Sequence, residues 1–362
     1  MQKIHEKRIE VLEKLADDGE TRNVTIKRAD IVADMLNLYT DNNVTGFLLN
    51  FNFLNEPALD FDGVKREAFT LFWEKVLPIY FEGTNSYVPR ISPDIEETMY
   101  TTLGRILSHG FLMVGVFPPS LNKVFFTALL TGKENVSDMD FLEGFLDYVS
   151  YYDNLRLQEI LEKCNSQVSL SDENIDFLLE FLSEFGVSKM PNANNLETIL
   201  VSVAKTELWN KAVMAAGAMK KGMLEGLHRE LWLPATKELV LDLYSSLNVT
   251  TEKVLKLITV DNPDAMTKGQ QTVYMYFRRY VRSLNEKELA CLLRYVTGSS
   301  SLAVETIKVI FHAQVGNLPH VSVHACSGIV DLPSSGYESF PDFRSQMVEL
   351  LNNADSWKFS LA

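Results

Sequence analysis

The sequence predicts an α+β protein in which a large, mainly helical N-terminal lobe is hinged to a small α/β C-terminal lobe. Three observations lead to this fold class. Amphipathic helical patterns dominate the chain from about residue 95 to residue 230. The stretch ITVDNPDAMTKGQQ, near residues 258–270, then concentrates the turn-forming residues that are typical of a linker. Beyond it, Ile307, Val309 and Phe311 alternate with period two, as the apolar residues of a strand do.

The N-terminal elements follow from short local patterns. Residues 1–21 are predicted to form a linker and helix, and a short strand with Val24 and Ile26 precedes a second helix. The segment GFLLNFNFLNEPALDFDGV is predicted to form a strand and an acidic turn, after which Asp62 would cap the start of a helix. Alternation places Leu49, Phe51 and Phe53 on one face of the strand. Helical spacing places Phe69, Phe72 and Val76 on one face of the helix.

The helical region has one predicted interruption. Residues 95–134 are predicted to be helical except at Pro118-Pro119. Acidic amphipathic helices follow within residues 137–185, and more helix is expected over residues 195–230. The aromatic residues of the acidic helices are most simply core residues: Phe141, Phe145, Tyr148, Tyr151 and Tyr152. We therefore expect the large lobe to span residues 22–262, and the hinge and small lobe to span residues 263–362.

Composition excludes several classes of function. The chain carries 34 basic and 48 acidic residues, a net charge of −14. This charge argues against non-specific binding of nucleic acid, which requires basic patches that displace counterions. The apolar run near residues 110–117 is too short to span a membrane. Because no targeting segment is visible, the sequence predicts a soluble protein of the cytosol or nucleus, bound neither to nucleic acid nor to membrane.

The three cysteines are Cys164, Cys291 and Cys326. Their odd number and wide spacing argue against a disulfide framework and against a cysteine-rich zinc site. The histidines at positions 109, 228, 312 and 320 show no metal-ligand spacing, and we expect them to be core or solvated residues. No glycine-rich phosphate loop is present. We therefore expect neither a metal nor a cofactor, and we expect Cys164 and Cys291 to be packing residues.

Cys326 is the most informative position in the chain. It follows the alternating stretch Val321–Ala325, so His324 and Cys326 would share one strand face, about 7 Å apart. A thiolate is the reactive form of cysteine, and a nearby imidazole can favour it. On local spacing alone, however, a small buried hydrophobic residue is the more common role of a lone cysteine.

Four stretches of the chain extend this interpretation through a resemblance. LPHVSVHACSGIVDLP resembles the pattern L-P-x-A-H-T-C-F-N-x-L-x-L-P of HECT-type ubiquitin ligase domains, with His324 and Cys326 at matching offsets. LLRYVTGSSSL resembles the entry to the small lobe of that family, and FLNEPALDFDGVKREAF and LGRILSHGFLMVGVFPPSLNKVFFTALLTGK resemble two stretches of its large lobe. Phe359 matches the phenylalanine that the family commonly has four residues from its end. The resemblance covers about residues 22–362 and is closest to the divergent G2/M-phase-specific ubiquitin ligase group.

The resemblance implies a bilobal HECT-like fold and a ubiquitin-protein transferase. Cys326 would accept ubiquitin from a conjugating enzyme as a thioester intermediate and pass it to a lysine of a protein substrate. His324 would assist at the site, and Phe359 would order the chain end. Residues 137–190 would be the subdomain that docks the conjugating enzyme, with some of the aromatic residues exposed for that purpose.

Departures from the family pattern leave alternatives open. Ala325 replaces the usual threonine, and Ser327-Gly328 replaces the usual Phe-Asn. These changes support an alternative in which the chain is a catalytically weakened or inactive HECT-like interaction module. A cysteine hydrolase that uses Cys326 and His324 is a further alternative, although no separate orienting Asn or Asp motif accompanies them.

Overall fold

The computed structural model describes residues 2–18, 20–56, 61–313, 320–325 and 327–352. Contacts between residues divide the chain into two compact units. The first unit combines Met1–Glu74, Ile106–Pro118 and Ser245–Ala362, and the second combines Lys75–Arg105 and Pro119–Tyr244. The first unit is therefore assembled from segments that lie far apart in the sequence.

The N-terminal part of the first unit confirms the predicted order of helix, strand, helix and strand. Helix α1 (Gln2–Asp18) precedes β1 (Thr21–Ile26), α2 (Ile31–Leu38) and β2 (Leu48–Phe53), and the two strands pair in parallel. Alternate residues of β2 are buried because one face of this strand contacts the core. The predicted face is confirmed, since its members are all buried: Leu49, Phe51 and Phe53.

Helix α3 (Phe61–Tyr80) carries the predicted apolar face, and Phe69, Phe72 and Val76 are fully buried. The rings of Phe51 and Phe69 meet edge to face at 5.6 Å, which joins β2 to this helix. The predicted capping role of Asp62 is wrong. The helix already begins at Phe61, so Asp62 lies in the first turn, where its carboxylate faces the positive end of the helix dipole.

The predicted interruption at Pro118-Pro119 is confirmed. Helix α4 (Glu97–Val114) ends before it, and α5 (Lys123–Thr131) begins after it. The side-chain oxygen of Asn122 accepts hydrogen bonds from the backbone amides of Val124 and Phe125, each at 3.0 Å. This cap satisfies amides that have no partner within the helix and so fixes where α5 starts.

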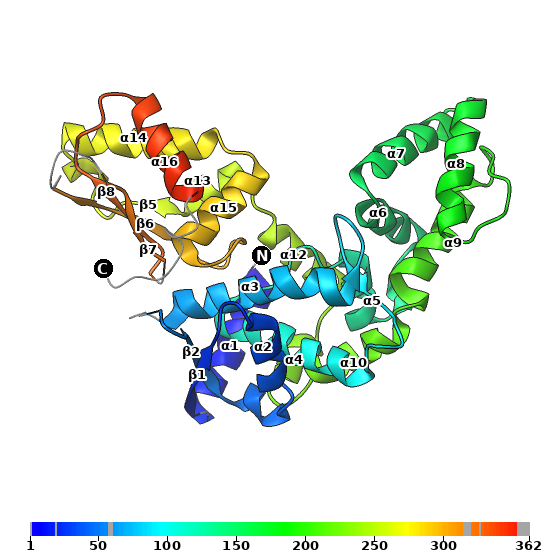
Figure 1. Ribbon diagram of the computed structural model, residues 1–362, viewed down its shortest axis with the longest axis horizontal. Coiled ribbons are helices and arrows are strands. Elements are labelled where there is room, and N and C mark those ends of the chain that lie inside the picture. The colour runs from blue at the N-terminus through cyan, green and yellow to red at the C-terminus, as the bar shows by residue number, and fades with distance from the viewer. Residues whose placement is uncertain (1, 19, 57–60, 314–319, 326, 353–362) are drawn as a thin grey trace. The chain divides into compact units, whose positions relative to one another are not determined.

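Serine residues set the starts of the next three helices, which lie together in the second unit (Figure 1). These are α6 (Asp138–Tyr148), α7 (Tyr151–Asn165) and α8 (Asp172–Glu184), capped by Ser137, Ser150 and Ser171. The unit continues through further helices and a short hairpin: α9 (Leu196–Lys205), α10 (Val213–Met223), α11 (His228–Trp232), the start of α12 (Lys237–Leu247), β3 (Phe81–Glu82) and β4 (Val88–Pro89).

The C-terminal part of the first unit is a four-stranded sheet with helices around it (Figure 1). The strands lie in the order β5-β6-β8-β7, and only the β7–β8 pair is antiparallel. The elements are α13 (Thr251–Leu257), β5 (Ile258–Thr259), α14 (Lys268–Arg282), α15 (Glu286–Thr297), β6 (Ile307–His312), β7 (Ser322–His324), β8 (Ile329–Pro333) and α16 (Phe340–Asn352). The predicted α+β class, with a mainly helical part before a small α/β part, is confirmed.

The core of this C-terminal part begins earlier than the predicted linker. Val254 and Ile258 belong to its hydrophobic cluster, and Ile258 pairs with Ile307 of the central strand β6. The first residues of the predicted linker at 258–270 are therefore a strand of the sheet. Ile258 is 4% exposed, and burial of this apolar side chain stabilises the strand pairing. The boundary at residues 262 and 263 stays a prediction.

The structure predicts opposite effects for two Gly→Ala substitutions. Gly298 has a φ of +78°, and an added Cβ would lie 2.6 Å from the carbonyl oxygen of Gly63. Gly298→Ala should lower the free energy of unfolding by about 2–4 kcal/mol, through left-handed strain and overpacking. Gly217, inside α10, has no atom within 4 Å of an added Cβ. Gly217→Ala should stabilise the protein by about 0.5–1 kcal/mol. Urea denaturation followed by circular dichroism measures both effects, and equal shifts would contradict the assignment.

Candidate catalytic site

The backbone on both sides of position 326 is held by hydrogen bonds. The amide of Ser327 donates to the carbonyl of His324 at 3.0 Å, and the amide of Lys308 donates to the carbonyl of Gly328 at 2.9 Å. Cys326 itself lies outside the described residues, as does Phe359. Hydrogen bonds thus hold the described backbone before and after the predicted nucleophile.

His324 is the last residue of β7 and pairs with Ile329 of β8. Strand β7 lies at the edge of the sheet, so one of its sides carries no partner strand among the described elements. The His324 side chain is half-buried. The edge strand ends at His324, two residues before position 326.

Gly328 has a φ of +61°, in the left-handed region. An added Cβ would lie 3.1 Å from the carbonyl oxygen of Thr306. Asparagine, which the resembling family pattern has at this offset, is one of the few residues besides glycine that readily adopts this conformation. The glycine at this offset therefore suits the left-handed backbone of this chain.

Arg66 contacts this segment, although the sequence analysis assigned it no role. Its side chain is 7% exposed. Its Nε donates to the carbonyl of Thr297 at 2.6 Å, and its Nη2 donates to the carbonyl of Ala325 at 3.0 Å. One side chain on α3 thus contacts both the end of α15 and the residue before Cys326.

The neighbouring residue, Glu67, is the centre of a buried ion network. Its Oε1 accepts from Arg28 Nη1 at 2.7 Å and from Arg294 Nη2 at 3.0 Å, and its Oε2 accepts from Arg294 Nε at 3.2 Å. Arg294 also donates to Glu74 at 2.5 Å. Burial alone would lower the pKa of Arg294, but the Glu67 carboxylate raises it overall. The network connects α15 to α3.

The sequence contains a signal for this network. Arg66 and Glu67 sit side by side in GVKREAFTLFW, a helix whose surrounding positions are apolar. Arginine and glutamate are almost never fully buried unless they are paired. Their partners cannot be identified from the sequence, because Arg294 is 227 residues from Glu67.

His109 and His312 form contacts within the fold. The ring of His109 is buried and lies 2.9 Å from the Tyr39 hydroxyl and 3.1 Å from the Phe47 carbonyl oxygen. His312 lies 2.9 Å from a carboxylate oxygen of Asp331. These two residues match the core or surface roles expected of them. Within the described ranges, no group of three or more potential ligands is arranged to hold a metal ion.

The surroundings of the two described cysteines disfavour ionisation of their thiols. Cys164 and Cys291 are half-buried, and Cys291 packs against the hydrophobic cluster of the C-terminal part. Burial raises the pKa of both thiols. A raised pKa lowers the fraction of reactive thiolate at neutral pH. Both residues therefore suit the packing role that was predicted for them.

The aromatic stripe of the predicted docking subdomain has two environments. Phe141, Phe145 and Tyr148 are buried, and the Phe145 ring contacts the rings of Phe181 and Phe185. The remaining two residues, Tyr151 and Tyr152 at the start of α7, are 70% and 64% exposed. The core prediction is confirmed for the first three and wrong for these two. The reason is that α7 starts at Tyr151, whose first turn faces solvent.

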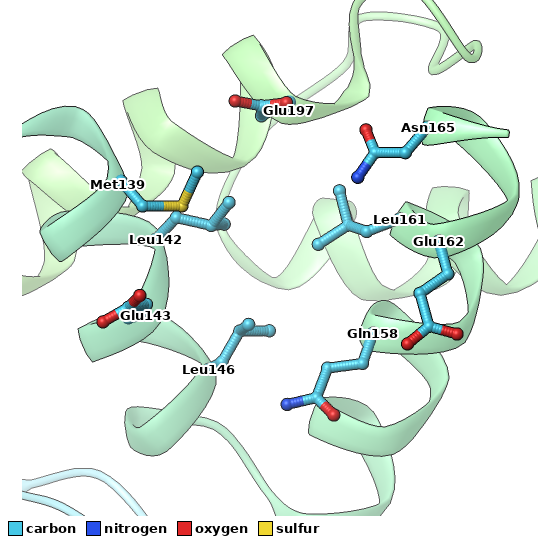
Figure 2. Close-up of a pocket in the computed structure, with 9 residues that line it drawn as sticks. All are labelled: Met139, Leu142, Glu143, Leu146, Gln158, Leu161, Glu162, Asn165 and Glu197. Atoms are coloured by element: carbon cyan, nitrogen blue, oxygen red, sulfur yellow. The ribbon is translucent and has the colours of Figure 1, made fainter. Parts of the chain in front are cut away.

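A groove lies between α6 and α7 in the same unit (Figure 2). Its volume is about 230 Å³, and its apolar lining comes from Met139, Leu142, Leu146 and Leu161. Three exposed glutamates, Glu143, Glu162 and Glu197, lie around these side chains with Gln158 and Asn165. The groove therefore offers apolar contact with an acidic rim, which suits an apolar side chain flanked by basic groups.

The helices of the described residues are too short or too polar to cross a membrane. The observation concerns these residues alone.

Comparisons with known proteins agree on one family. The model of the HECT-domain (ubiquitin-transferase) family matches residues 64–360. The chain is 22% identical over 339 residues to an "E3 ubiquitin-protein ligase TOM1-like" of Neurospora crassa, which covers 84% of this chain and 8% of that protein. It is 23% identical over 279 residues to a "Bifunctional serine/threonine-protein kinase/NEDD4-like E3 ubiquitin-protein ligase" of Dictyostelium discoideum, covering 73% of this chain and 13% of that protein. The chain thus spans a small part of each relative.

The ion network predicts a large loss of stability from a nearly isosteric change. Glu67→Gln removes the carboxylate and leaves Arg28 and Arg294 close together without it, which should lower the free energy of unfolding by about 3–5 kcal/mol. Glu10→Gln is the matched control, because Glu10 is exposed on α1, where it forms ion pairs with Lys7 and Lys14. The control should unfold at the wild-type urea concentration. A similar midpoint for Glu67→Gln and wild type would show that the network does not hold the fold together.

Proposed function

Because the chain belongs to the HECT-domain (ubiquitin-transferase) family, we propose that it accepts ubiquitin from a conjugating enzyme as a thioester on Cys326 and passes it to a lysine of a protein substrate. One observation carries the proposal. The residues that flank position 326 are held by hydrogen bonds from separate elements, at the end of an edge strand. A fixed backbone at an accessible edge is what an exchange between two proteins requires.

The proposed reaction has two steps. The Cys326 thiolate attacks the carbonyl carbon of the ubiquitin thioester, a new C–S bond forms, and the conjugating enzyme leaves as a thiolate. A substrate lysine amine then attacks the new thioester, an isopeptide C–N bond forms, the amine loses a proton, and the Cys326 thiolate leaves. The first step exchanges one thioester for another, so it depends mainly on bringing the two sulfur atoms together. No metal or cofactor takes part in either step.

Two further residues have proposed roles. His324 precedes Cys326 by two residues at the end of β7, and we propose that its imidazole assists proton movement or positions the turn. Phe359 is proposed to order the chain end during transfer to lysine, on the resemblance of its position to that of the family's phenylalanine. These roles concern the second step more than the first.

Movement of the C-terminal part between donor and acceptor is part of the proposal. The predicted pivot at residues 258–270 overlaps β5, whose Ile258 pairs with β6. Val254 of α13 also belongs to the same hydrophobic cluster. We therefore propose that the pivot lies before α13, within residues 248–250 between α12 and α13. Bending there leaves the sheet intact but breaks the contacts of Arg66 and Glu67 with the C-terminal part, so these contacts belong to one of the two positions.

The region of residues 137–190 is the proposed docking surface for the conjugating enzyme. Tyr151 and Tyr152 are exposed next to each other at the start of α7, and Leu155 on the same helix is 49% exposed. Exposed aromatic side chains of this kind are frequent anchors in protein interfaces. The apolar groove with its acidic rim adds a contact for a partner that carries basic residues. The alternative, an inactive interaction module, would keep this docking surface without transfer.

The thioester proposal predicts a reductant-sensitive adduct. The full chain, mixed with ubiquitin, activating enzyme, ATP and a panel of conjugating enzymes, should form a ubiquitin adduct that a reducing gel removes. Cys326→Ala should abolish it, whereas Cys164→Ser and Cys291→Ser should retain it, because burial raises the pKa of those two thiols. His324→Ala should form the adduct and slow its transfer to lysine by about 100-fold or more. Phe359→Ala should also form the adduct and slow its transfer to lysine.

Absence of an adduct from folded wild-type chain with every conjugating enzyme would favour the inactive module. An adduct that survives in Cys326→Ala and disappears in Cys291→Ser would move the nucleophile to Cys291. Unchanged transfer rates in His324→Ala and Phe359→Ala would remove the roles proposed for those residues.

The docking proposal predicts a loss of affinity. Tyr151→Ala combined with Tyr152→Ala should weaken binding of the most active conjugating enzyme by about 30-fold or more, as expected for central aromatic anchors. Isothermal titration calorimetry measures the dissociation constant. Met275→Ala is the control, because Met275 is also highly exposed, at 60%, but lies on α14. If both variants bind as tightly as wild type, the docking surface lies elsewhere.

A further inference from the structure

Arg66 is a buried arginine whose guanidinium donates hydrogen bonds to two backbone carbonyls. Its Nε and Nη2 donate to the carbonyls of Thr297 and Ala325, at 2.6 Å and 3.0 Å. Thr297 is the last residue of α15, so its carbonyl has no acceptor role within that helix. Hydrogen bonds from a charged donor are stronger than those between neutral groups. Arg66 therefore connects the end of α15 to the residue that follows β7, two segments that are not adjacent in the sequence.

The location of Arg66 on α3 is itself fixed. Glu67, the next residue, holds Arg294 of α15 in a two-point contact and also accepts from Arg28. After α15, the backbone of Gly298 approaches the carbonyl oxygen of Gly63 so closely that a Cβ would lie 2.6 Å from it. These contacts locate the start of α3 against the end of α15. The guanidinium of Arg66 is consequently held at a defined place before it meets Ala325.

The contact with Ala325 supplies a constraint that the sheet does not. On the C-terminal side of position 326, β6 holds Gly328 through the amide of Lys308. On the N-terminal side, β7 pairs with β8 as far as His324, and beyond it the bond from the Ser327 amide to the His324 carbonyl is internal to the segment. Arg66 is the described group outside the sheet that anchors this side, through the carbonyl of Ala325.

We propose that Arg66 is a positioning residue for the reaction: by binding the carbonyl of Ala325, it sets the orientation of the segment that carries Cys326. The inference rests on the proposed function. It is compatible with the alanine at position 325, because a backbone carbonyl accepts this hydrogen bond whatever side chain the residue has. Lysine cannot replace arginine here, because its single ammonium group lacks the planar fork that reaches two carbonyls at once.

The test compares Arg66→Lys with Arg105→Lys in the full chain. Arg105 is a matched control, since its side chain is 12% exposed and makes a two-point contact with Glu225 in the second unit. Hydrogen–deuterium exchange followed by mass spectrometry reports the backbone around residues 322–330 without any requirement for activity. Single-turnover kinetics with a ubiquitin-loaded conjugating enzyme then gives the maximal rate of adduct formation and the half-saturating concentration.

Arg66→Lys should increase exchange in residues 322–330 by about 10–100-fold, as expected from losing a charged hydrogen bond, and leave exchange in α14 unchanged. It should lower the maximal rate of adduct formation by a similar factor with the half-saturating concentration unchanged. Arg105→Lys should change neither quantity. Wild-type exchange in Arg66→Lys, faster exchange without a slower reaction, or the same effects in Arg105→Lys would each overturn the proposal. If wild-type chain forms no adduct, the proposed function fails, and the exchange result alone decides whether Arg66 holds this segment.

Discussion

The carboxylate of Glu67 is 5% exposed and lies between two arginines, one from before α2 and one from α15. A buried carboxylate without such partners would be strongly destabilising, because desolvation is compensated only by charge pairing and hydrogen bonds. This requirement fixes which segments can meet at α3. The pairing of Glu67 with Arg294 places α15 against α3. The turn after α15 then lies so close to the first turn of α3 that only glycine fits at position 298. The apolar face of α3 is free to pack in the opposite direction, against β2.

Local patterns in the sequence were sufficient for most elements of the fold. Leu49, Phe51 and Phe53 alternate in sequence and are buried on β2, and the serine caps at Ser137, Ser150 and Ser171 are short-range signals. The linker prediction failed in part because Asn262, Pro263 and Asp264 are local turn residues, whereas the strand at Ile258 depends on its pairing with Ile307. Asp62 was predicted to cap α3, whereas the helix begins one residue earlier, at Phe61.

The site was only partly predictable for the same reason. Cys326 and His324 stand out through the spacing of the segment and through its resemblance to a family pattern. Arg66 does not, because its two acceptors are 231 and 259 residues away in the chain. The structure also shows what the residues that depart from the pattern do in the fold. Gly328 suits the left-handed backbone at its position, and Ala325 contributes its carbonyl to the contact with Arg66.

The arrangement of the first unit has a consequence for synthesis on the ribosome. Glu67 is made 227 residues before Arg294, an interval of about 10–45 s at typical rates of translation. The second unit is complete once Tyr244 has been added, whereas the first still lacks everything from Ser245 onward. The first unit therefore begins synthesis before the second unit and is completed after it. The charged side chains of α3 stay hydrated after they leave the ribosome, until α15 has been synthesised and can pair with them.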